Sequence, residues 1–120
     1  MNYKVVDLFA GGGGLSLGFS SSGFDVVCAI EKWQPAIDIY QENFKSHPVI
    51  NIDLADIDNA SDIIDGYKAN IIIGGSPCQD FSSAGKRDET LVRANLTVSF
   101  AEVIDKCRPE IFVMENGPSQ

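Results

Sequence analysis

The stretch VVDLFAGGGGLSLGF, residues 5–19, decides the fold. It opens with an apolar run that is rich in β-branched and aromatic side chains, as buried strands are. Four consecutive glycines follow at positions 11–14, and an apolar segment of helical character begins directly after them. The stretch therefore predicts a strand, a tight turn and a helix, which is how a βαβ unit begins.

The same alternation of strand and helix patterns continues along the chain. We predict strands at 3–9, 24–30, 49–52, 69–73 and 110–114, and helices near 15–20, 35–44, 59–64 and 91–107. Residues 74–90 are polar and rich in glycine and serine, and are predicted to form a loop. Alternating elements imply right-handed parallel crossovers, hence an α/β fold with a doubly wound, mostly parallel sheet. Such sheets usually carry more strands at the far edge, so the domain is expected to be truncated after its fifth strand.

Composition excludes several classes of protein. The 120 residues carry 17 acidic and 9 basic side chains, a net charge of −8, which argues against strong nucleic-acid binding by this chain alone. No apolar run approaches the roughly 20 residues that span a bilayer, so no membrane association is expected. Three cysteines without a CxxC spacing do not suggest disulfides or zinc. The expected compartment is the reducing cytosol.

The glycine turn indicates a nucleotide-like ligand. Gly12, Gly14 and Gly18 form a G-x-G-x-x-x-G pattern related to the dinucleotide fingerprint. Glu31 follows the second strand, about 20 residues on, where a carboxylate commonly accepts hydrogen bonds from ribose hydroxyls. This pair suggests an adenosine-containing ligand and leaves open whether it is a nicotinamide cofactor or S-adenosylmethionine. Asp53, residues 74–78 and residues 115–116 follow other strands, so polar side chains should converge on one edge of the sheet.

One cysteine stands apart from the other two. Cys78 follows Pro77 in the loop sequence GGSPCQDFSS, residues 74–83, where glycines give access and the proline fixes the backbone. A thiol in such a loop is a candidate nucleophile if its surroundings lower its pKa. Cys28 in a strand and Cys107 in a helix are expected to be buried and inert.

Three segments together resemble the cytosine-5 DNA methyltransferases of bacterial restriction-modification systems. They are DLFAGGGGLSLGF, GGSPCQDFSSAGKR and PEIFVMEN, and they occur in the order and spacing of that family over essentially the whole chain. The resemblance implies a Rossmann-like fold that binds S-adenosylmethionine. It also implies methyl transfer to carbon 5 of a cytosine flipped out of double-stranded DNA, in the bacterial cytosol.

The resemblance also implies roles for individual residues. Cys78 would attack carbon 6 of the cytosine, Glu115 would hold its ring nitrogen 3 and amine, and Asn116 would support the Pro77–Cys78 turn. DNA phosphates would lie near Gln79, Ser82, Lys86 and Arg87, in a loop running to about Arg93. The cofactor would contact Phe9, Ala10, Gly11, Gly12, Gly13, Gly14, Glu31, Asp53, Leu54, Gly75, Pro77 and Leu96.

The chain also departs from the family pattern. Gly117 stands where valine is usual, and Lys32 and Trp33 are not expected to be specific contacts; packing of Trp33 is an even alternative. His47 is expected to be a surface or capping residue rather than a base.

The arginine-containing strand motif, the target-recognition domain and the last helix are absent. Residues 1–120 are therefore expected to be a partial catalytic domain that needs a missing C-terminal part or a second polypeptide, alongside a cognate restriction endonuclease.

Three alternatives stay open. A related branch methylates a cytosine in transfer RNA, although PCQDFS favours DNA. The chain could instead be a non-catalytic cofactor-binding fragment or subunit. A nicotinamide dehydrogenase would leave the Pro-Cys-Gln loop and Glu115-Asn116 unexplained.

Overall fold

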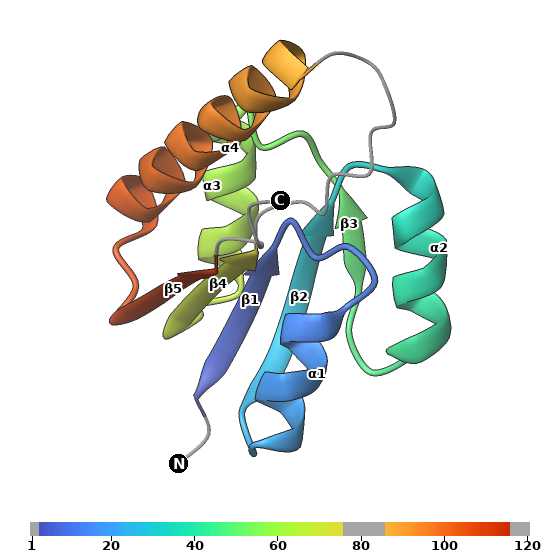
Figure 1. The fold of residues 1–120 in the computed structure, drawn as a ribbon. Helices are drawn as coiled ribbons and strands as arrows, with labels where there is room; N and C mark the ends of the chain where they lie inside the picture. The colour runs from blue at the N-terminus through green and yellow to red at the C-terminus, as the bar shows by residue number, and fades with distance from the viewer. Residues whose placement is uncertain (1–2, 76–85, 116–120) are drawn as a thin grey trace.

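The computed structural model describes residues 3–75 and 86–115, with side chains described from Leu96 onward in the helix that begins at Lys86. Strands and helices alternate along it as the sequence predicts (Figure 1). The elements are β1 (Lys4–Leu8), α1 (Gly14–Ser21), β2 (Asp25–Glu31), α2 (Gln34–Asn43), β3 (Val49–Asn51), α3 (Ile57–Gly66), β4 (Ile71–Gly75), α4 (Lys86–Cys107) and β5 (Ile111–Glu115). The loop prediction for residues 74–90 was wrong from Lys86 onward, because α4 begins there.

The strands form one sheet in the order β3-β2-β1-β4-β5. Every neighbouring pair is parallel, with Val5 opposite Val26 on one side of β1 and opposite Ile71 on the other. The chain runs outward from β1 to β3 and then returns to the other side of β1 with β4. The predicted doubly wound α/β fold is therefore confirmed, and its topological switch point lies between β1 and β4.

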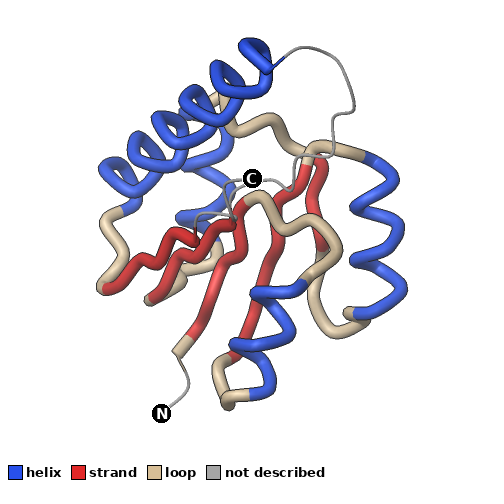
Figure 2. The backbone as a smooth tube through the Cα atoms, viewed as in Figure 1, coloured by secondary structure: helices blue, strands red, loops and turns tan. Residues whose placement is uncertain are grey.

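Helices cover both faces of the sheet (Figure 2). Helices α3 and α4 pack on one face, over a core that includes Val6, Leu8 and Ile72. Helices α1 and α2 cover the other face in two smaller clusters, around Val5 and around Tyr40. The side chains of β1 alternate between these faces, as strand geometry requires. Asp7 therefore points to the same face as Val5, into the layer beneath α1 and α2.

Gly13 shapes the start of α1. Its φ of 102° lies in the left-handed region, where side chains with a Cβ are strained. A Cβ built there would lie 2.3 Å from the ring of Phe44 and 3.1 Å from that of Tyr40. The missing side chain thus lets the turn before α1 approach the aromatic residues of α2 and the segment after it.

Replacing Gly13 with alanine is expected to lower the free energy of unfolding by about 1–3 kcal/mol, through backbone strain and the clash with Phe44. Urea unfolding followed by circular dichroism measures this. Gly66→Ala is the matched control, since nothing lies within 4 Å of its Cβ position. Equal stability of the two variants would contradict the assigned role of Gly13.

Candidate functional site

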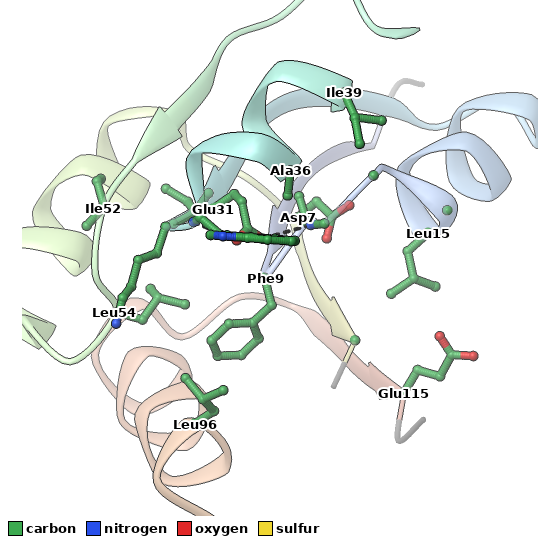
Figure 3. A pocket seen from close by; sticks show the side chains of 18 of the residues that line it. Asp7, Phe9, Leu15, Glu31, Ala36, Ile39, Ile52, Leu54, Leu96 and Glu115 are labelled. Atoms are coloured by element: carbon green, nitrogen blue, oxygen red, sulfur yellow. Dashed lines mark hydrogen bonds between the residues drawn. The ribbon is translucent and has the colours of Figure 1, made fainter. Parts of the chain in front are cut away.

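A pocket of about 650 Å³ lies over the carboxyl ends of the strands, at the switch point between β1 and β4. Residues from the glycine turn, from the segments after β2 and β3, and from the ends of β4 and β5 line it. Figure 3 shows Phe9 near the centre, with Glu31 and Glu115 on opposite sides of it. This is where ligands bind in open α/β sheets.

Most residues predicted to bind a cofactor meet in this pocket. Those that line it are Phe9, Ala10, Gly11, Gly12, Gly14, Glu31, Asp53, Leu54, Gly75 and Leu96. Gly13 is not among the lining residues and shapes the turn instead. Pro77 lies outside the described residues. The convergence of strand-end residues that the sequence predicts is therefore present in the structure.

Glu31 is fixed by two backbone hydrogen bonds. Its Oε1 accepts the N–H of Gly11 at 2.8 Å, and its Oε2 accepts the N–H of Trp33 at 2.9 Å. Because each carboxylate oxygen has two lone pairs, both oxygens keep a free acceptor site. A pair of vicinal hydroxyls could donate to those sites, so the geometry suits a ribose.

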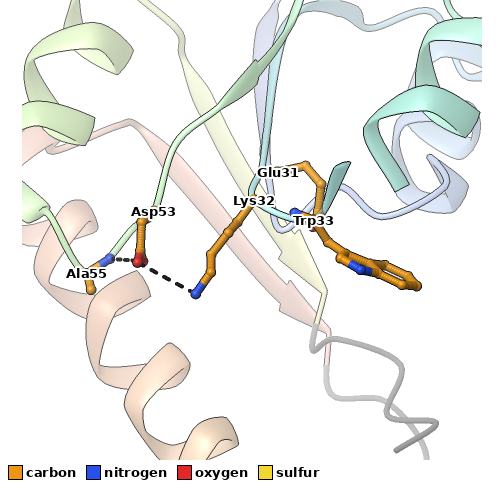
Figure 4. Close-up of polar contacts among 5 residues, drawn as sticks. All are labelled: Glu31, Lys32, Trp33, Asp53 and Ala55. Carbon is orange, nitrogen blue, oxygen red and sulfur yellow. Dashed lines mark hydrogen bonds and ion pairs between the residues drawn. The ribbon is translucent and has the colours of Figure 1, made fainter. Parts of the chain in front are cut away.

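The rim of the pocket carries Lys32, Trp33 and Asp53 (Figure 4). Lys32 Nζ lies 3.6 Å from Asp53 Oδ2, and both side chains are more than half exposed, so this ion pair is weak. Asp53 Oδ1 accepts the N–H of Ala55 at 2.9 Å. The indole of Trp33 points away from Asp53 and is 67% exposed while lining the pocket. The alternative that Trp33 is packed was therefore wrong.

Phe9 holds an unusual backbone conformation beneath the pocket. Its φ is 57°, in the left-handed region that non-glycine residues rarely adopt. Its ring stacks on Phe100 of α4 at a centroid distance of 6.4 Å. Leu96 of α4 lines the pocket close to it (Figure 3). Strained residues of this kind gather at ligand sites, and Phe9 lines the pocket here.

Asp7 is a buried carboxylate at the wall of the pocket. It is 1% exposed, and its Oδ2 accepts a hydrogen bond from the Ser16 hydroxyl. Its Oδ1 has no hydrogen-bond partner among the described residues. Burial raises the pKa of Asp7 to about 7, the hydrogen bonds from Ser16 lower it, and the charge of Glu31 raises it slightly. The pKa of Asp7 therefore lies well above the ordinary value of a carboxyl group.

The predicted catalytic and DNA-binding residues are described only in part. Glu115 ends β5 and lines the pocket. A Cβ on Gly75 would lie 3.7 Å from Glu115 Oε1, so this glycine leaves the space beside the carboxylate clear. Lys86 and Arg87 begin α4 rather than lying in a loop. The residues outside the described part of the chain are Cys78, Gln79, Ser82 and Asn116.

Several residues that line the pocket were not predicted from the sequence. The apolar walls include Leu15, Ala36, Ile39 and Ile52. A helical apolar pattern does not reveal which of its residues face a ligand instead of the core. Asp7 gave the one usable signal, because a carboxylate inside an otherwise apolar strand needs an explanation.

The other cysteines differ in burial. Cys28 is fully buried, as predicted, whereas Cys107 is only partly buried. Burial raises the pKa of each thiol to about 11, so both stay protonated at neutral pH.

Among the residues that the structure describes, none of the helices has the length and apolar character that a membrane span requires.

Comparison with known families shows which family the chain belongs to. The family model of C-5 cytosine-specific DNA methylases matches residues 3–119. The chain belongs to this family. The resemblance carried by the three sequence segments is thereby confirmed, and the dehydrogenase alternative falls away.

Individual members of the C-5 cytosine-specific DNA methylase family are similar over nearly the whole chain. The type II methyltransferase M.HgiGI of Herpetosiphon aurantiacus is 54% identical, over 94% of this chain and 89% of its own length. M.HindV of Haemophilus influenzae is 57% identical over 94% of this chain, which corresponds to 37% of M.HindV. The chain thus spans little more than a third of the longer relative.

A solved structure of a similar protein supports the assigned fold. A protein described as a DNA modification methyltransferase of an Escherichia coli prophage superposes with a TM-score of 0.77 at 35% identity. The match covers 98% of this chain and 32% of that protein. The sheet therefore has the fold of that methyltransferase structure.

Proposed function

We propose that residues 1–120 form the cofactor-binding part of a DNA cytosine-5 methyltransferase and that the pocket binds S-adenosylmethionine. The observation that carries this proposal is the convergence of the glycine turn, Glu31, Asp53 and Glu115 on one pocket in a chain of this family. When bound, the cofactor supplies the methyl group that is transferred to carbon 5 of cytosine. The proposed compartment is the cytosol of a bacterium with a restriction-modification system.

The pocket fits the chemistry of that cofactor. Glu31 offers two oriented acceptor sites for the ribose hydroxyls. The side chains of Trp33, Ile52 and Leu54 provide apolar surface for a purine, and the carboxylate of Asp53 at the same rim could accept from its amine. The cavity volume of about 650 Å³ lies within the range of roughly 300–1,000 Å³ of small-ligand sites.

The catalytic roles are part of the proposal. Cys78 follows β4 and Glu115 ends β5, and these strands are adjacent and parallel, with Gly75 opposite Glu115. Cys78 is proposed to attack carbon 6 of an extruded cytosine while Glu115 holds the pyrimidine edge. Asn116 is proposed to support the cysteine turn, and Gln79, Ser82, Lys86 and Arg87 to contact DNA.

An additional segment or chain is proposed to complete the enzyme. Ile111, Phe112 and Val113 of the edge strand β5 are between 39% and 56% exposed. An exposed apolar edge strand can pair with a further strand. M.HindV, of which this chain covers 37%, contains additional sequence that could supply such a strand. The proposed occupant supplies target recognition, which the acidic composition of this chain does not favour.

The proposed function is tested by trapping. The chain, together with any completing polypeptide, is incubated with S-adenosylmethionine and a duplex containing 5-fluorocytosine, and the mass at Cys78 is measured. A covalent DNA adduct that Cys78→Ser abolishes is expected. An adduct that persists in Cys78→Ser would refute the assigned nucleophile, and an adduct with a transfer RNA substrate instead would assign the other branch of the family.

Trp33 provides a second test at the pocket. Trp33→Ala is expected to weaken S-adenosylmethionine binding roughly tenfold, since stacking of a base on an aromatic ring contributes about 1–3 kcal/mol. Trp33→Phe keeps a ring and should lose much less. Calorimetric titration measures both, and unchanged stability is expected because the side chain is 67% exposed. Equal affinity of Trp33→Ala and the unsubstituted chain would exclude stacking.

A further inference from the structure

A chain of hydrogen bonds connects the pocket wall to the surface. The Ser16 hydroxyl contacts Asp7 Oδ2 on one side and lies 2.8 Å from the Tyr40 hydroxyl on the other. The Tyr40 hydroxyl in turn contacts Nε2 of His47. Asp7, Ser16 and Tyr40 are essentially inaccessible to solvent, whereas His47 is partly exposed. We call these four residues the relay.

The relay can be ordered in two directions. An ionised Asp7 only accepts, so Ser16 donates to it, Tyr40 donates to Ser16, and His47 must donate from Nε2. An Asp7 protonated on Oδ2 donates to Ser16, and every bond then reverses. Tyr40 now donates to Nε2, and neutral His47 carries its proton on Nδ1, where the Ser46 hydroxyl lies 3.4 Å away.

Packing keeps the relay in place. The ring of Tyr40 stacks on Phe44 at a centroid distance of 4.4 Å and meets His47 edge-on at 5.6 Å. Because the two hydroxyls are buried with only these partners among the described residues, they cannot turn to water. A change of direction at Asp7 must therefore reach His47.

We infer that His47 is a positioning residue for Asp7, acting through Tyr40 and Ser16, and that binding of a cationic ligand in the pocket releases a proton along this relay. The inference rests on the proposed function, because S-adenosylmethionine carries a sulfonium and an ammonium group. Oδ1 of Asp7 is buried at the pocket wall and has no hydrogen-bond partner among the residues that the structure describes. A cation in the pocket would favour the ionised form of this carboxyl.

The proton step balances. Asp7 Oδ2–H passes its proton to Ser16 Oγ, Ser16 passes its own to Tyr40 Oη, and Tyr40 passes its own to His47 Nε2. His47 then releases its Nδ1 proton to water. The products are the Asp7 carboxylate, two restored hydroxyls, neutral His47 protonated on Nε2, and one proton in solution.

Other titratable groups face the relay. The carboxyl of Glu31 faces Asp7, the thiol of Cys28 faces Tyr40, and the carboxyl of Asp25 faces His47. Burial lowers the pKa of His47 below its usual value of 6.5, and Asp25 opposes that effect. Because its pKa lies below the usual value, the imidazole favours its neutral form in the range where Asp7 titrates, and its tautomer reports the direction of the relay.

The test uses nitrogen-15 NMR of the whole chain, whose single histidine gives one pair of ring signals. Between pH 6 and 9, without ligand, the Nε2–H tautomer is expected to gain population as Asp7 ionises. Asp7→Asn, Ser16→Ala and Tyr40→Phe should each remove this step. Tyr3→Phe is the matched control, because Tyr3 packs on Phe24 away from the relay. A step that persists in Asp7→Asn overturns the inference.

The ligand supplies the second readout. Saturating S-adenosylmethionine near pH 6.5 should shift His47 toward the Nε2–H tautomer. Calorimetry in two buffers with different ionisation enthalpies should show up to one proton released, and none for Asp7→Asn. Binding without either change overturns the inference. Absence of binding while the ligand-free pH step remains would instead refute the proposed cofactor and leave the relay supported.

Discussion

Replacing Glu31 with alanine is expected to weaken S-adenosylmethionine binding by 100-fold or more. The ribose hydroxyls lose two charge-assisted hydrogen bonds, each worth about 1.5–3 kcal/mol. The N–H groups of Gly11 and Trp33 also lose their shared acceptor, so the glycine turn and the segment after β2 lose their common anchor. Both losses act at the same end of the pocket.

Calorimetric titration measures the effect, with circular dichroism to confirm that the variant folds. The affinity of Glu31→Gln for S-adenosylmethionine should lie between those of Glu31→Ala and the unsubstituted chain, because glutamine keeps one acceptor oxygen. Asp38→Ala is the matched control, since Asp38 is an exposed carboxylate of α2 that bonds only Gln34 among the described residues and does not line the pocket. Equal affinities for Glu31→Ala and Asp38→Ala would remove Glu31 from the ribose site.

The free energy of unfolding of the unsubstituted chain is expected to fall between mild acid and neutral pH. Replacing Asp7 with asparagine is expected to prevent much of that fall. Burial raises the pKa of Asp7 from 3.8 to about 7 in the folded chain. In that interval the folded state binds a proton that the unfolded state does not, so the free energy of unfolding falls as pH rises. Three pKa units correspond to a contribution on the order of 4 kcal/mol, present below pH 4 and lost by about pH 7.

Urea unfolding of both proteins from pH 4 to pH 8 measures this contribution. The difference between Asp7→Asn and the unsubstituted chain isolates it from the other carboxylates, which both proteins share. The difference should change in favour of Asp7→Asn as pH rises through the interval. A difference that is independent of pH would show that Asp7 titrates normally.

The fold could be predicted because its signals are local. The runs around Val5, Val26 and Ile71 are apolar on both faces except for Asp7, as in strands buried between two helical layers. Pro35 correctly placed the first turn of α2. The start of α4 was missed because residues 86–90 are charged and polar and carry no apolar repeat. Their helicity comes from the longer helix that they extend.

The site could be predicted only at positions where the function requires one particular type of residue. The glycine turn and Glu31 did so, because turn geometry and ribose binding each demand a particular side chain. His47 was expected at the surface, and it is partly exposed, yet its bond to Tyr40 depends on how the segment after α2 packs. Trp33 was not expected to be a specific contact, since sequence cannot show that an indole lies at the mouth of a pocket.

The most direct measurement of the central claim is a calorimetric titration of the purified chain with S-adenosylmethionine, with NAD as the competing adenosine ligand. The account predicts saturable one-to-one binding of S-adenosylmethionine, lost in Glu31→Ala, and no binding of NAD. A folded chain that binds NAD, or that gives no heat with S-adenosylmethionine, would contradict the assignment of this pocket.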